Sequence, residues 1–367
     1  MQFIDLKKQY DRLSSDIKKR IDIVLNHGQY IMGPEIDELE KKLSEFVGSR
    51  YCLSCSSGTD ALLIALMAKG ISPGDKVITT PFTYIATAEV IKLLGATPVF
   101  VDIDSDTFNI DPKKLEEALK DSEVKSVIPV NLFGLTADYD SIYDVCKEKN
   151  IFILEDAAQS FGALYKNKRS GSLGDVSATS FFPAKPLGCY GDGGAIFTND
   201  DNLYHIMESI RIHGKGDNKY DCDRVGLNGR LDTIQAAVLL SKLEIYKEEI
   251  DLRQNVASLY SEKLKGNIKT PFTPEGYESV WAQYCIVLEN ESIRENVMKK
   301  LKDEEIPSVI YYQKPLHIQK TFNDLDYDWG DFPVSEDIST RILSLPMHPY
   351  LDESSIDKIC KIIISSI

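Results

Sequence analysis

The sequence predicts an α/β fold with a mostly parallel sheet, followed by a smaller α+β part. Short apolar runs alternate with amphipathic segments from about residue 51 to residue 198, which is typical of strands alternating with helices. A long helical segment then covers residues 233–264, and mixed strand and helix patterns follow it. A chain of 367 residues is too long for one ordinary core. We therefore predict a large domain at 1–250 and a small C-terminal domain at 251–367, with the boundary between about residues 245 and 265.

Composition excludes several classes of function. The chain is 43% hydrophobic and 27% charged, with a net charge of −15, which argues against nucleic-acid binding. We find no apolar run long enough to span a bilayer and no signal peptide, so we expect a cytoplasmic protein without a membrane partner. Seven scattered cysteines fit a reducing compartment. Cys52 and Cys55 have zinc-like spacing, but no second pair follows, so we expect buried thiols and no metal.

The first 46 residues predict two helices. Apolar residues recur at threes and fours over residues 5–27, and a second helix follows from Pro34 to about Phe46. The break between them contains Tyr30 and Gly33, which could line a cleft or simply connect the helices.

From residue 51 the alternation begins with a strand, a small polar turn and a helix. Tyr51–Ser56 predicts the strand, Ser56–Asp60 the turn and Ala61–Ala68 the helix. This arrangement can bind phosphate through backbone N–H groups and the helix dipole. The alternative is an ordinary helix cap made by Ser57 or Thr59.

The predicted elements continue in the same alternation as far as residue 198. Strands are expected at 76–80, 97–102, 124–130, 151–154, 177–182 and 195–198, and helices ending at Leu94, at 112–120 and at 137–149. A loop with two aromatic residues, at 81–87, precedes the first of these helices. In such a sheet, ligands collect at the carboxyl ends of the strands.

Two of these strand ends carry chemistry. Glu155 and Asp156 end a fully apolar strand, where buried acids are costly unless they are paired. An acid there could pair with a pyridinium nitrogen, or it could cap the following helix. The strand at 177–182 leads to Lys185, which lies between two prolines and precedes a run rich in glycine. A lysine held among apolar neighbours can be kept neutral and form a Schiff base, whereas the alternative is an incidental lysine in a surface loop.

The remaining chain predicts α+β structure. Strands are expected at 282–288 and 308–312, and helices at 292–304 and 354–367. The glycines after Lys185 do not give the dinucleotide-binding pattern G-x-G-x-x-G, and a strand rather than a helix follows them. A Rossmann dehydrogenase is therefore disfavoured.

Four ordered motifs give a resemblance to a known family. The motifs are Ser57–Leu62, Glu155–Gly162, Ser180–Ala195 and Asn228–Ala237. With them the chain resembles the sugar aminotransferases of the DegT/DnrJ/StrS family, which are pyridoxal-phosphate enzymes of fold type I. The resemblance covers nearly the whole chain. The sequences of Ser180–Ala195 and Leu345–Leu351 are most similar to those of aminotransferases that act on a UDP-linked 3-oxo-N-acetylglucosaminuronate.

The resemblance implies roles for eight cofactor-binding residues. Lys185 would form the Schiff base with pyridoxal 5'-phosphate, Asp156 would pair with the ring nitrogen, and Gln159 would face the ring hydroxyl. Gly58, Thr59 and Ser180 would hold the phosphate, and Tyr84 would stack on the ring. Asn228 would reach the phosphate of the neighbouring subunit, which implies a homodimer with shared active sites. From composition alone, Asn228–Gly229 is only a turn.

The resemblance also implies two half-reactions. Lys185 acts as general base and acid, L-glutamate leaves its amino group on the cofactor as pyridoxamine 5'-phosphate, and a nucleotide-linked keto sugar then receives it. The product would be a 3-amino sugar for surface polysaccharide or glycan biosynthesis. Residues that could hold the substrate are cationic or aromatic or line the predicted cleft: Tyr30, Gly33, Arg211, His213, Arg230, Tyr311, Tyr312 and His317. For Arg230 and the two histidines, a solvated charge is the alternative.

Three rivals within the fold remain after this comparison. A dTDP-linked 3-oxo- or 4-oxo-6-deoxyhexose could be the acceptor instead of a UDP-linked uronate. Sugar dehydratases of the family tend to replace the lysine with histidine or to add an iron–sulfur cluster, but Lys185 is present and the cysteines lack cluster spacing. A regulator built on this fold would normally add a DNA-binding domain, for which the chain has neither room nor a basic segment.

Overall fold

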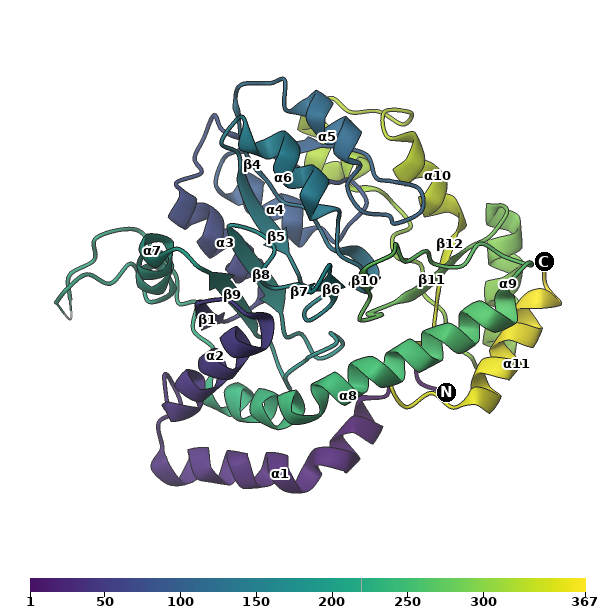
Figure 1. The fold of residues 1–367 in the computed structure, drawn as a ribbon, viewed down its shortest axis with the longest axis horizontal. Helices are drawn as coiled ribbons and strands as arrows, with labels where there is room; N and C mark the ends of the chain where they lie inside the picture. Colours follow the sequence, from purple (N-terminus) through teal and green to yellow (C-terminus); the bar gives the residue numbers. More distant parts are fainter. Residues whose placement is uncertain (219) are drawn as a thin grey trace.

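A computed structural model describes residues 1–218 and 220–367. Its centre is a seven-stranded sheet in the order β1-β9-β8-β5-β4-β2-β3 (Figure 1). The strands are β1 (Tyr51–Cys55), β2 (Lys76–Thr79), β3 (Thr97–Phe100), β4 (Val124–Val127), β5 (Phe152–Asp156), β8 (Val176–Ser180) and β9 (Gly194–Thr198). Only β9 runs antiparallel to its neighbours, so the sheet is mixed but mostly parallel, as predicted.

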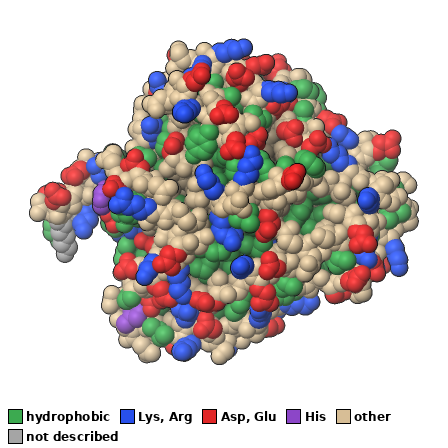
Figure 2. Space-filling view, in the orientation of Figure 1, with side chains coloured by type: hydrophobic (Ala, Val, Ile, Leu, Met, Phe, Trp, Pro, Cys, Tyr) green, Lys and Arg blue, Asp and Glu red, His purple; other side chains and the backbone are tan. Residues whose placement is uncertain are grey.

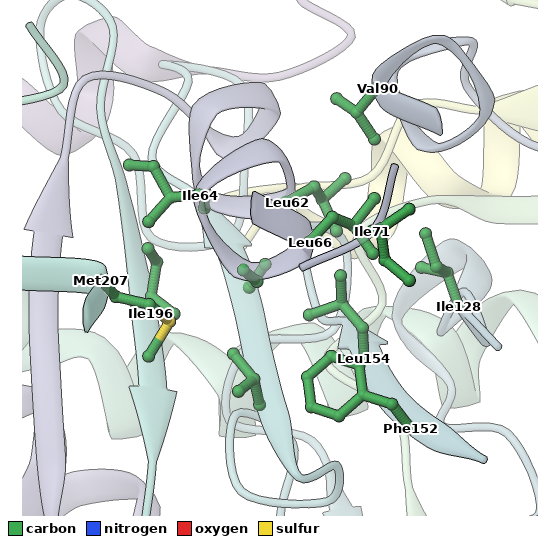
Figure 3. Packing of buried hydrophobic residues seen from close by; sticks show 14 of the residues in the cluster. Leu62, Ile64, Leu66, Ile71, Val90, Ile128, Phe152, Leu154, Ile196 and Met207 are labelled. Atoms are coloured by element: carbon green, nitrogen blue, oxygen red, sulfur yellow. The ribbon is translucent and has the colours of Figure 1, made fainter. Parts of the chain in front are cut away.

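Helices cover both faces of this sheet because alternate residues of the strands point to opposite sides. In β1, Leu53 packs into one core and Cys52 into another. The first face carries α3 (Gly58–Lys69), α4 (Ala86–Leu93) and α7 (Asp201–Arg211). Figure 3 shows how Leu62 and Leu66 of α3 lie over Leu154 of β5. The second face carries α2 (Pro34–Val47), α5 (Pro112–Ala118), α6 (Tyr139–Lys147) and α8 (Thr233–Leu264).

The helix α8 links two cores. Its first half, including Leu239 and Ile250, packs on the sheet, and its second half, including Val256 and Leu264, packs in a separate core. That second core also contains residues of α9 (Glu291–Asp303), α11 (Glu353–Ile364), β11 (Tyr284–Val287) and β12 (Ile342–Leu345). Figure 1 shows α8 running along the molecule toward α9 and α11, with α1 (Leu6–His27) beside it. A division at residues 250/251 stays a prediction, since it falls inside this one helix.

The remaining elements are short. They are β6 (Leu164–Tyr165), β7 (Lys168–Arg169), β10 (Tyr277–Glu278), α10 (Pro333–Arg341) and three 3-10 turns, η1 (Leu132–Gly134), η2 (Leu316–Ile318) and η3 (Lys320–Leu325). The strand predicted at 308–312 is wrong: this segment makes only the isolated bridge between Val309 and Ser344. The sequence interpretation also missed α7, which begins at the Asp200 cap.

The surface carries interspersed charge. On the face in Figure 2, acidic and basic side chains alternate around green apolar patches. Among residues 1–218 and 220–367, no helix combines the length and the hydropathy needed to cross a membrane.

Candidate active site

The carboxyl ends of β1, β5 and β8 meet at one edge of the sheet. The register pairs Gly194 of β9 with Cys55 on one side and with Ser180 on the other, so the last residues of β1 and β8 flank it. On the far side of β8, Asp156 pairs with Ala178. The chain segments that follow these strands, beginning at Ser56, Ala157 and Phe181, therefore leave the sheet side by side.

A narrow cradle forms where β1 leads into α3. A Cβ atom added to Gly58 would lie 2.6 Å from the Cβ of Ser180, and one added to Gly194 would lie 2.5 Å from the carbonyl oxygen of Ser57. Only glycine fits at these two positions, because a methyl group would overlap atoms that cannot move away. Ser57 caps α3 by accepting a hydrogen bond from the Asp60 N–H, at 3.0 Å. The other N–H groups of this helix start, including Thr59, point out of the helix toward the edge.

Asp156 is buried at the end of β5. It is 4% exposed, and its Oδ2 accepts a hydrogen bond from Thr87 Oγ1 at 2.8 Å. Its Oδ1 accepts from the Ala158 N–H at 3.1 Å. Burial raises the pKa of Asp156, while these two donors and the charge of Lys185 act against the rise. The carboxylate thus has few partners for a buried charge and is ready to receive a cationic N–H.

Gln159 is fixed from two sides. Its Oε1 accepts a hydrogen bond from the Phe133 N–H at 2.8 Å, and its Nε2 donates to the Tyr312 hydroxyl at 3.2 Å. Gln159 is 4% exposed, so its orientation is set by η1 and by the segment 311–312. These contacts fix the Gln159 amide near the end of β5, where Asp156 lies three residues earlier in the chain.

Lys185 lies in the loop that connects β8 to β9. Its N–H donates to the Phe182 carbonyl at 2.9 Å, which closes a tight turn around the lysine. Burial lowers the pKa of Lys185, and the nearby Asp156 carboxylate partly offsets this. An amine with a lowered pKa is neutral for more of the time and can act as a nucleophile or a base.

Two further cofactor candidates lie at the rim. Tyr84 is 58% exposed in the loop before α4 and presents a free ring face. Asn228 is exposed at the base of the segment 212–228, where it forms an antiparallel bridge with Ile212. The next residue, Gly229, accepts a hydrogen bond from Ser56 N–H of the same chain at 3.0 Å. Asn228 therefore lies beside the cradle, and its contact with a second subunit stays a prediction.

Tyr30 and Gly33 occupy the junction between α1 and α2. Tyr30 is 48% exposed, and its carbonyl oxygen accepts from the Thr233 N–H at 2.9 Å. The Gly33 N–H donates to Thr233 Oγ1 at 3.1 Å, and a Cβ there would lie 2.5 Å from the Gln29 carbonyl oxygen. Gly33 is thus needed for close packing against the start of α8, whereas the Tyr30 side chain is free to meet a ligand.

Two of the predicted substrate residues are engaged inside the protein. Arg211 is 2% exposed, and its guanidinium donates to Glu40 at 2.6 Å and to the Ser54 carbonyl at 2.9 Å. His317 is 1% exposed and pairs through Nε2 with Glu336 at 3.1 Å. Burial lowers the pKa of His317, and Glu336 opposes that change. Arg211 Nε and His317 Nδ1 are buried without a hydrogen-bond partner, but both side chains are almost fully buried and already paired with a carboxylate, so the structure does not bring them to the open part of the site.

The other substrate candidates divide by exposure. His213 is exposed in the segment 212–228, with a φ of 58°. Arg230 follows Gly229 next to the cradle, and its Nε is buried without a hydrogen-bond partner. Tyr311 is half-buried and meets Phe3 edge-on, with ring centroids 6.3 Å apart. Tyr312 is half-buried as well, and its hydroxyl accepts a hydrogen bond from Gln159 at 3.2 Å. Arg230 and Tyr311 are therefore the best placed of these four for a polar ligand at the edge.

Sequence reasoning missed Thr87. It is 1% exposed at the start of α4, and its hydroxyl is one of only two donors that the structure gives to Asp156. The sequence signal that could have pointed to Thr87 is a hydroxyl residue at the end of the aromatic loop that follows β2. Within the described residues, no three His, Cys, Asp or Glu side chains gather in a way that could hold a metal ion.

Comparisons with known proteins agree with this geometry. Residues 11–364 match the DegT/DnrJ/EryC1/StrS aminotransferase family. A UDP-2-acetamido-2-deoxy-3-oxo-D-glucuronate aminotransferase of Pseudomonas aeruginosa is 52% identical, with 98% of both chains covered. The crystal structure of a DegT DnrJ EryC1 StrS aminotransferase from Brucella abortus is 49% identical, with a TM-score of 0.95 over 99% of this chain and 98% of that one. The PLP-form of the putative sugar aminotransferase Spr1654 from Streptococcus pneumoniae is 27% identical, with a TM-score of 0.91 over 96% of both chains.

Proposed function

The chain belongs to the DegT/DnrJ/EryC1/StrS aminotransferase family, and we propose that it transfers the amino group of L-glutamate to C3 of UDP-2-acetamido-2-deoxy-3-oxo-D-glucuronate. The observation that carries this proposal is the 52% identity, over 98% of both chains, to an aminotransferase named for that sugar. The site at the edge of the sheet supports it, because an acid, an amide, a lysine and a helix N-terminus converge there.

The residues at the edge fit pyridoxal 5'-phosphate, the cofactor of this family. The cradle at Gly58 and Ser180 has no room for a side chain and offers a helix N-terminus, which suits a phosphate. Asp156 would receive the N–H of the ring nitrogen, Gln159 would face the ring hydroxyl, and Tyr84 would cover a ring face. When bound, the cofactor supplies an aldehyde that condenses with a primary amine and a ring that draws electrons from the carbon bearing that amine.

The protein's own contribution is to move one proton and to hold charge. Because burial lowers its pKa, the Lys185 amine would take a proton at Nζ from the carbon that bears the amino group and would later give that proton up again. Asp156 accepts hydrogen bonds from the Ala158 N–H and the Thr87 hydroxyl, which favour its charged form, and in that form it would stabilise positive charge at the ring nitrogen. Arg230 and Tyr311 would orient the acidic acceptor.

A substrate panel tests the sugar. Four acceptors are each assayed with L-glutamate. They are UDP-2-acetamido-2-deoxy-3-oxo-D-glucuronate, the UDP-3-oxo-N-acetylglucosamine whose sugar lacks the carboxylate, and dTDP-linked 3-oxo- and 4-oxo-6-deoxyhexoses. We expect kcat/KM for the uronate to exceed that for the uncharged sugar by about 10- to 100-fold, since a charge-assisted hydrogen bond contributes about 1.5–3 kcal/mol. Release of 2-oxoglutarate and the mass of the product measure it. Equal or better use of any neutral sugar would contradict the uronate assignment.

We also propose a cytoplasmic homodimer whose subunits share active sites. All seven cysteines are free, and six of them are buried, which fits a reducing compartment. Residues 212–218 and 220–228 extend away from the body beside α7 (Figure 1), and Val225 among them is 83% exposed. Near the site, Phe182 is 53% exposed. A second subunit that packs against these two places would cover both apolar side chains.

Complementation between two inactive variants tests the shared site. Lys185→Ala and Asn228→Ala are mixed, unfolded and refolded together. If Asn228 serves the neighbouring subunit, a mixed dimer has one site with both defects and one with none, so about a quarter of the wild-type activity should return. If each chain completes its own site, the mixture should remain as inactive as its components.

A further inference from the structure

One face of α8 carries a row of buried polar side chains. Lys242, Tyr246, Glu249 and Arg253 are spaced by four, three and four residues, so they lie on one face of the helix. Their exposed fractions are 0%, 0%, 1% and 4%. We call these four residues the polar row. Buried polar groups are costly unless they are bonded, so each member must have a partner elsewhere in the chain.

Each member of the polar row holds a different segment. Tyr246 donates to the Phe161 carbonyl at 2.5 Å, and Arg253 donates to the Trp281 carbonyl at 2.9 Å. Glu249 accepts from Gln9 Nε2 of α1, at 3.0 and 2.9 Å, and from the Tyr350 hydroxyl. Three of the four therefore tie the segment after β5, α1 and the C-terminal part of the chain to one helix.

Lys242 contacts the loop of the active-site lysine. Its Nζ donates to the Gly188 carbonyl at 2.6 Å and lies 4.2 Å from the centroid of the Tyr190 ring. Two turns earlier on α8, Gln235 accepts from the Tyr190 N–H at 2.8 Å and donates to the Tyr190 carbonyl at 3.2 Å. Three side-chain hydrogen bonds and a cation–π contact thus hold two residues of this loop, Gly188 and Tyr190.

We propose that Lys242 is a positioning residue that clamps the 186–191 segment and thereby fixes the backbone that carries Lys185. The loop folds back on itself at the clamped point: a Cβ at Gly188 would lie 2.6 Å from the carbonyl oxygens of both Phe182 and Pro183. Residues before and after Lys185 therefore contact each other at the point where Lys242 binds. The clamp thus constrains both ends of the turn that contains Lys185.

Burial of the Lys242 ammonium group without an ion pair to any described residue destabilises the fold, which indicates that the group has a function that offsets this cost. Among the described residues, Lys242 forms no ion pair, and the carboxylate that acts on its charge is Glu249 of the polar row. Burial lowers the pKa of Lys242 to about 8, and Glu249 and Cys189 oppose that change. An apolar residue would fill this core position without such a penalty. What Lys242 adds over an apolar residue is the bond to Gly188 and the contact with Tyr190.

Labelling of Cys189 provides a test that does not need activity. Cys189 is fully buried beside the clamp, with its Sγ 3.1 Å from the carbonyl oxygens of Phe181 and Gly191, so a thiol reagent reaches it only when the loop opens. We expect Lys242→Met to speed labelling of Cys189 by about tenfold in the full-length protein, with and without cofactor, since the lost bond contributes about 1.5 kcal/mol. Mass spectrometry reads each cysteine, and kcat should fall while KM for the sugar stays within twofold.

Matched variants separate positioning from general loosening. Lys263→Met removes another lysine of α8, which pairs at the surface with Glu353 and Asp357, and should leave Cys189 labelling unchanged. Lys242→Gln keeps a donor on a shorter arm and should restore part of the protection. Labelling of Cys189 in Lys242→Met within twofold of wild type would overturn the proposal. An equal rise at Cys285 and Cys360, which lie in other cores, would overturn it as well.

This proposal depends on the aminotransferase assignment only through the task given to Lys185. Protection of Cys189 is a property of the polypeptide, whatever reaction the site performs. A negative substrate panel together with faster Cys189 labelling would therefore refute the proposed sugar and leave the clamp standing. The reverse pair of results would refute the clamp alone.

Discussion

Lys185→Ala should reduce turnover by at least about 10⁴-fold, because it removes both a nucleophile and a general acid–base group from one site. No other residue is expected to take over this role. Lys185 lies in a tight turn that is closed by the hydrogen bond from its own N–H to the Phe182 carbonyl, and burial lowers its pKa. The measurement is 2-oxoglutarate release under saturating glutamate and sugar. The variant should fold normally, since an amine with few partners contributes little to stability.

Two companions make this result interpretable. Lys185→Arg keeps the length and the positive charge, but a guanidinium does not deprotonate, so it should be as inactive as the alanine variant. Borohydride reduction followed by peptide mass spectrometry should attach the cofactor to residue 185 in the wild-type protein and in neither variant. Turnover within tenfold of wild type in either variant, or attachment of the cofactor at another lysine, would contradict the role given to Lys185.

The residues that could be predicted are those whose position follows from strand order. Asp156, Lys185 and Ser57–Thr59 each follow a strand of a mostly parallel sheet, and such strands end at one edge. The strand that became β9 was also predicted, directly after the glycine-rich run, and the structure shows that it runs antiparallel to β1 and β8. The register of Cys55, Gly194 and Ser180 then brings the cradle together without any information from outside the sheet.

The residues that could not be predicted depend on contacts between distant segments. Arg211 was a substrate candidate because arginine suits carboxylates, and the structure pairs it with Glu40, 171 residues earlier in the chain. His317 is turned toward Glu336 in the same way. Thr87 and Lys242 give no sequence signal of their own, since their partners lie 69 and 54 residues away. Local patterns place strands and helices, whereas pairing across the fold decides which side chains remain free.

Asp156→Asn should have the second-largest effect, a loss of about 10³-fold or more in kcat, because a neutral amide does not stabilise positive charge at a ring nitrogen. Cofactor affinity should fall by about 10- to 100-fold, the usual contribution of one charge-assisted hydrogen bond. Thr87→Val removes one of the two donors to Asp156 and should cost about tenfold in kcat. Steady-state kinetics and cofactor titration measure all three quantities. Wild-type kcat in Asp156→Asn would contradict the pairing of Asp156 with the ring.

The same substitution should leave the cofactor-free protein at least as stable as wild type at neutral pH. Asparagine can keep both contacts of Asp156: its oxygen accepts from the Ala158 N–H, and its amide donates to Thr87, whose hydroxyl can rotate. The charge that burial disfavours is then gone. Since the pKa of Asp156 is raised in the folded protein, its contribution to stability is present below the unfolded pKa and lost as pH rises. The advantage of Asp156→Asn should therefore be largest near pH 7 and vanish as the pH approaches 4.

Glu155→Gln is the matched control, and it should change stability in the opposite direction. Burial raises the pKa of Glu155 as well, but each of its oxygens accepts a fixed backbone N–H, from Gly171 at 3.0 Å and from Leu173 at 2.8 Å. A glutamine amide in either orientation sets N–H against N–H, so we expect a loss of about 1–3 kcal/mol in the free energy of unfolding. Urea unfolding of the two cofactor-free variants measures the contrast. If both variants lose stability equally, the buried charge of Asp156 does not destabilise the cofactor-free protein. The argument that this charge is retained in order to bind a ligand would then be contradicted.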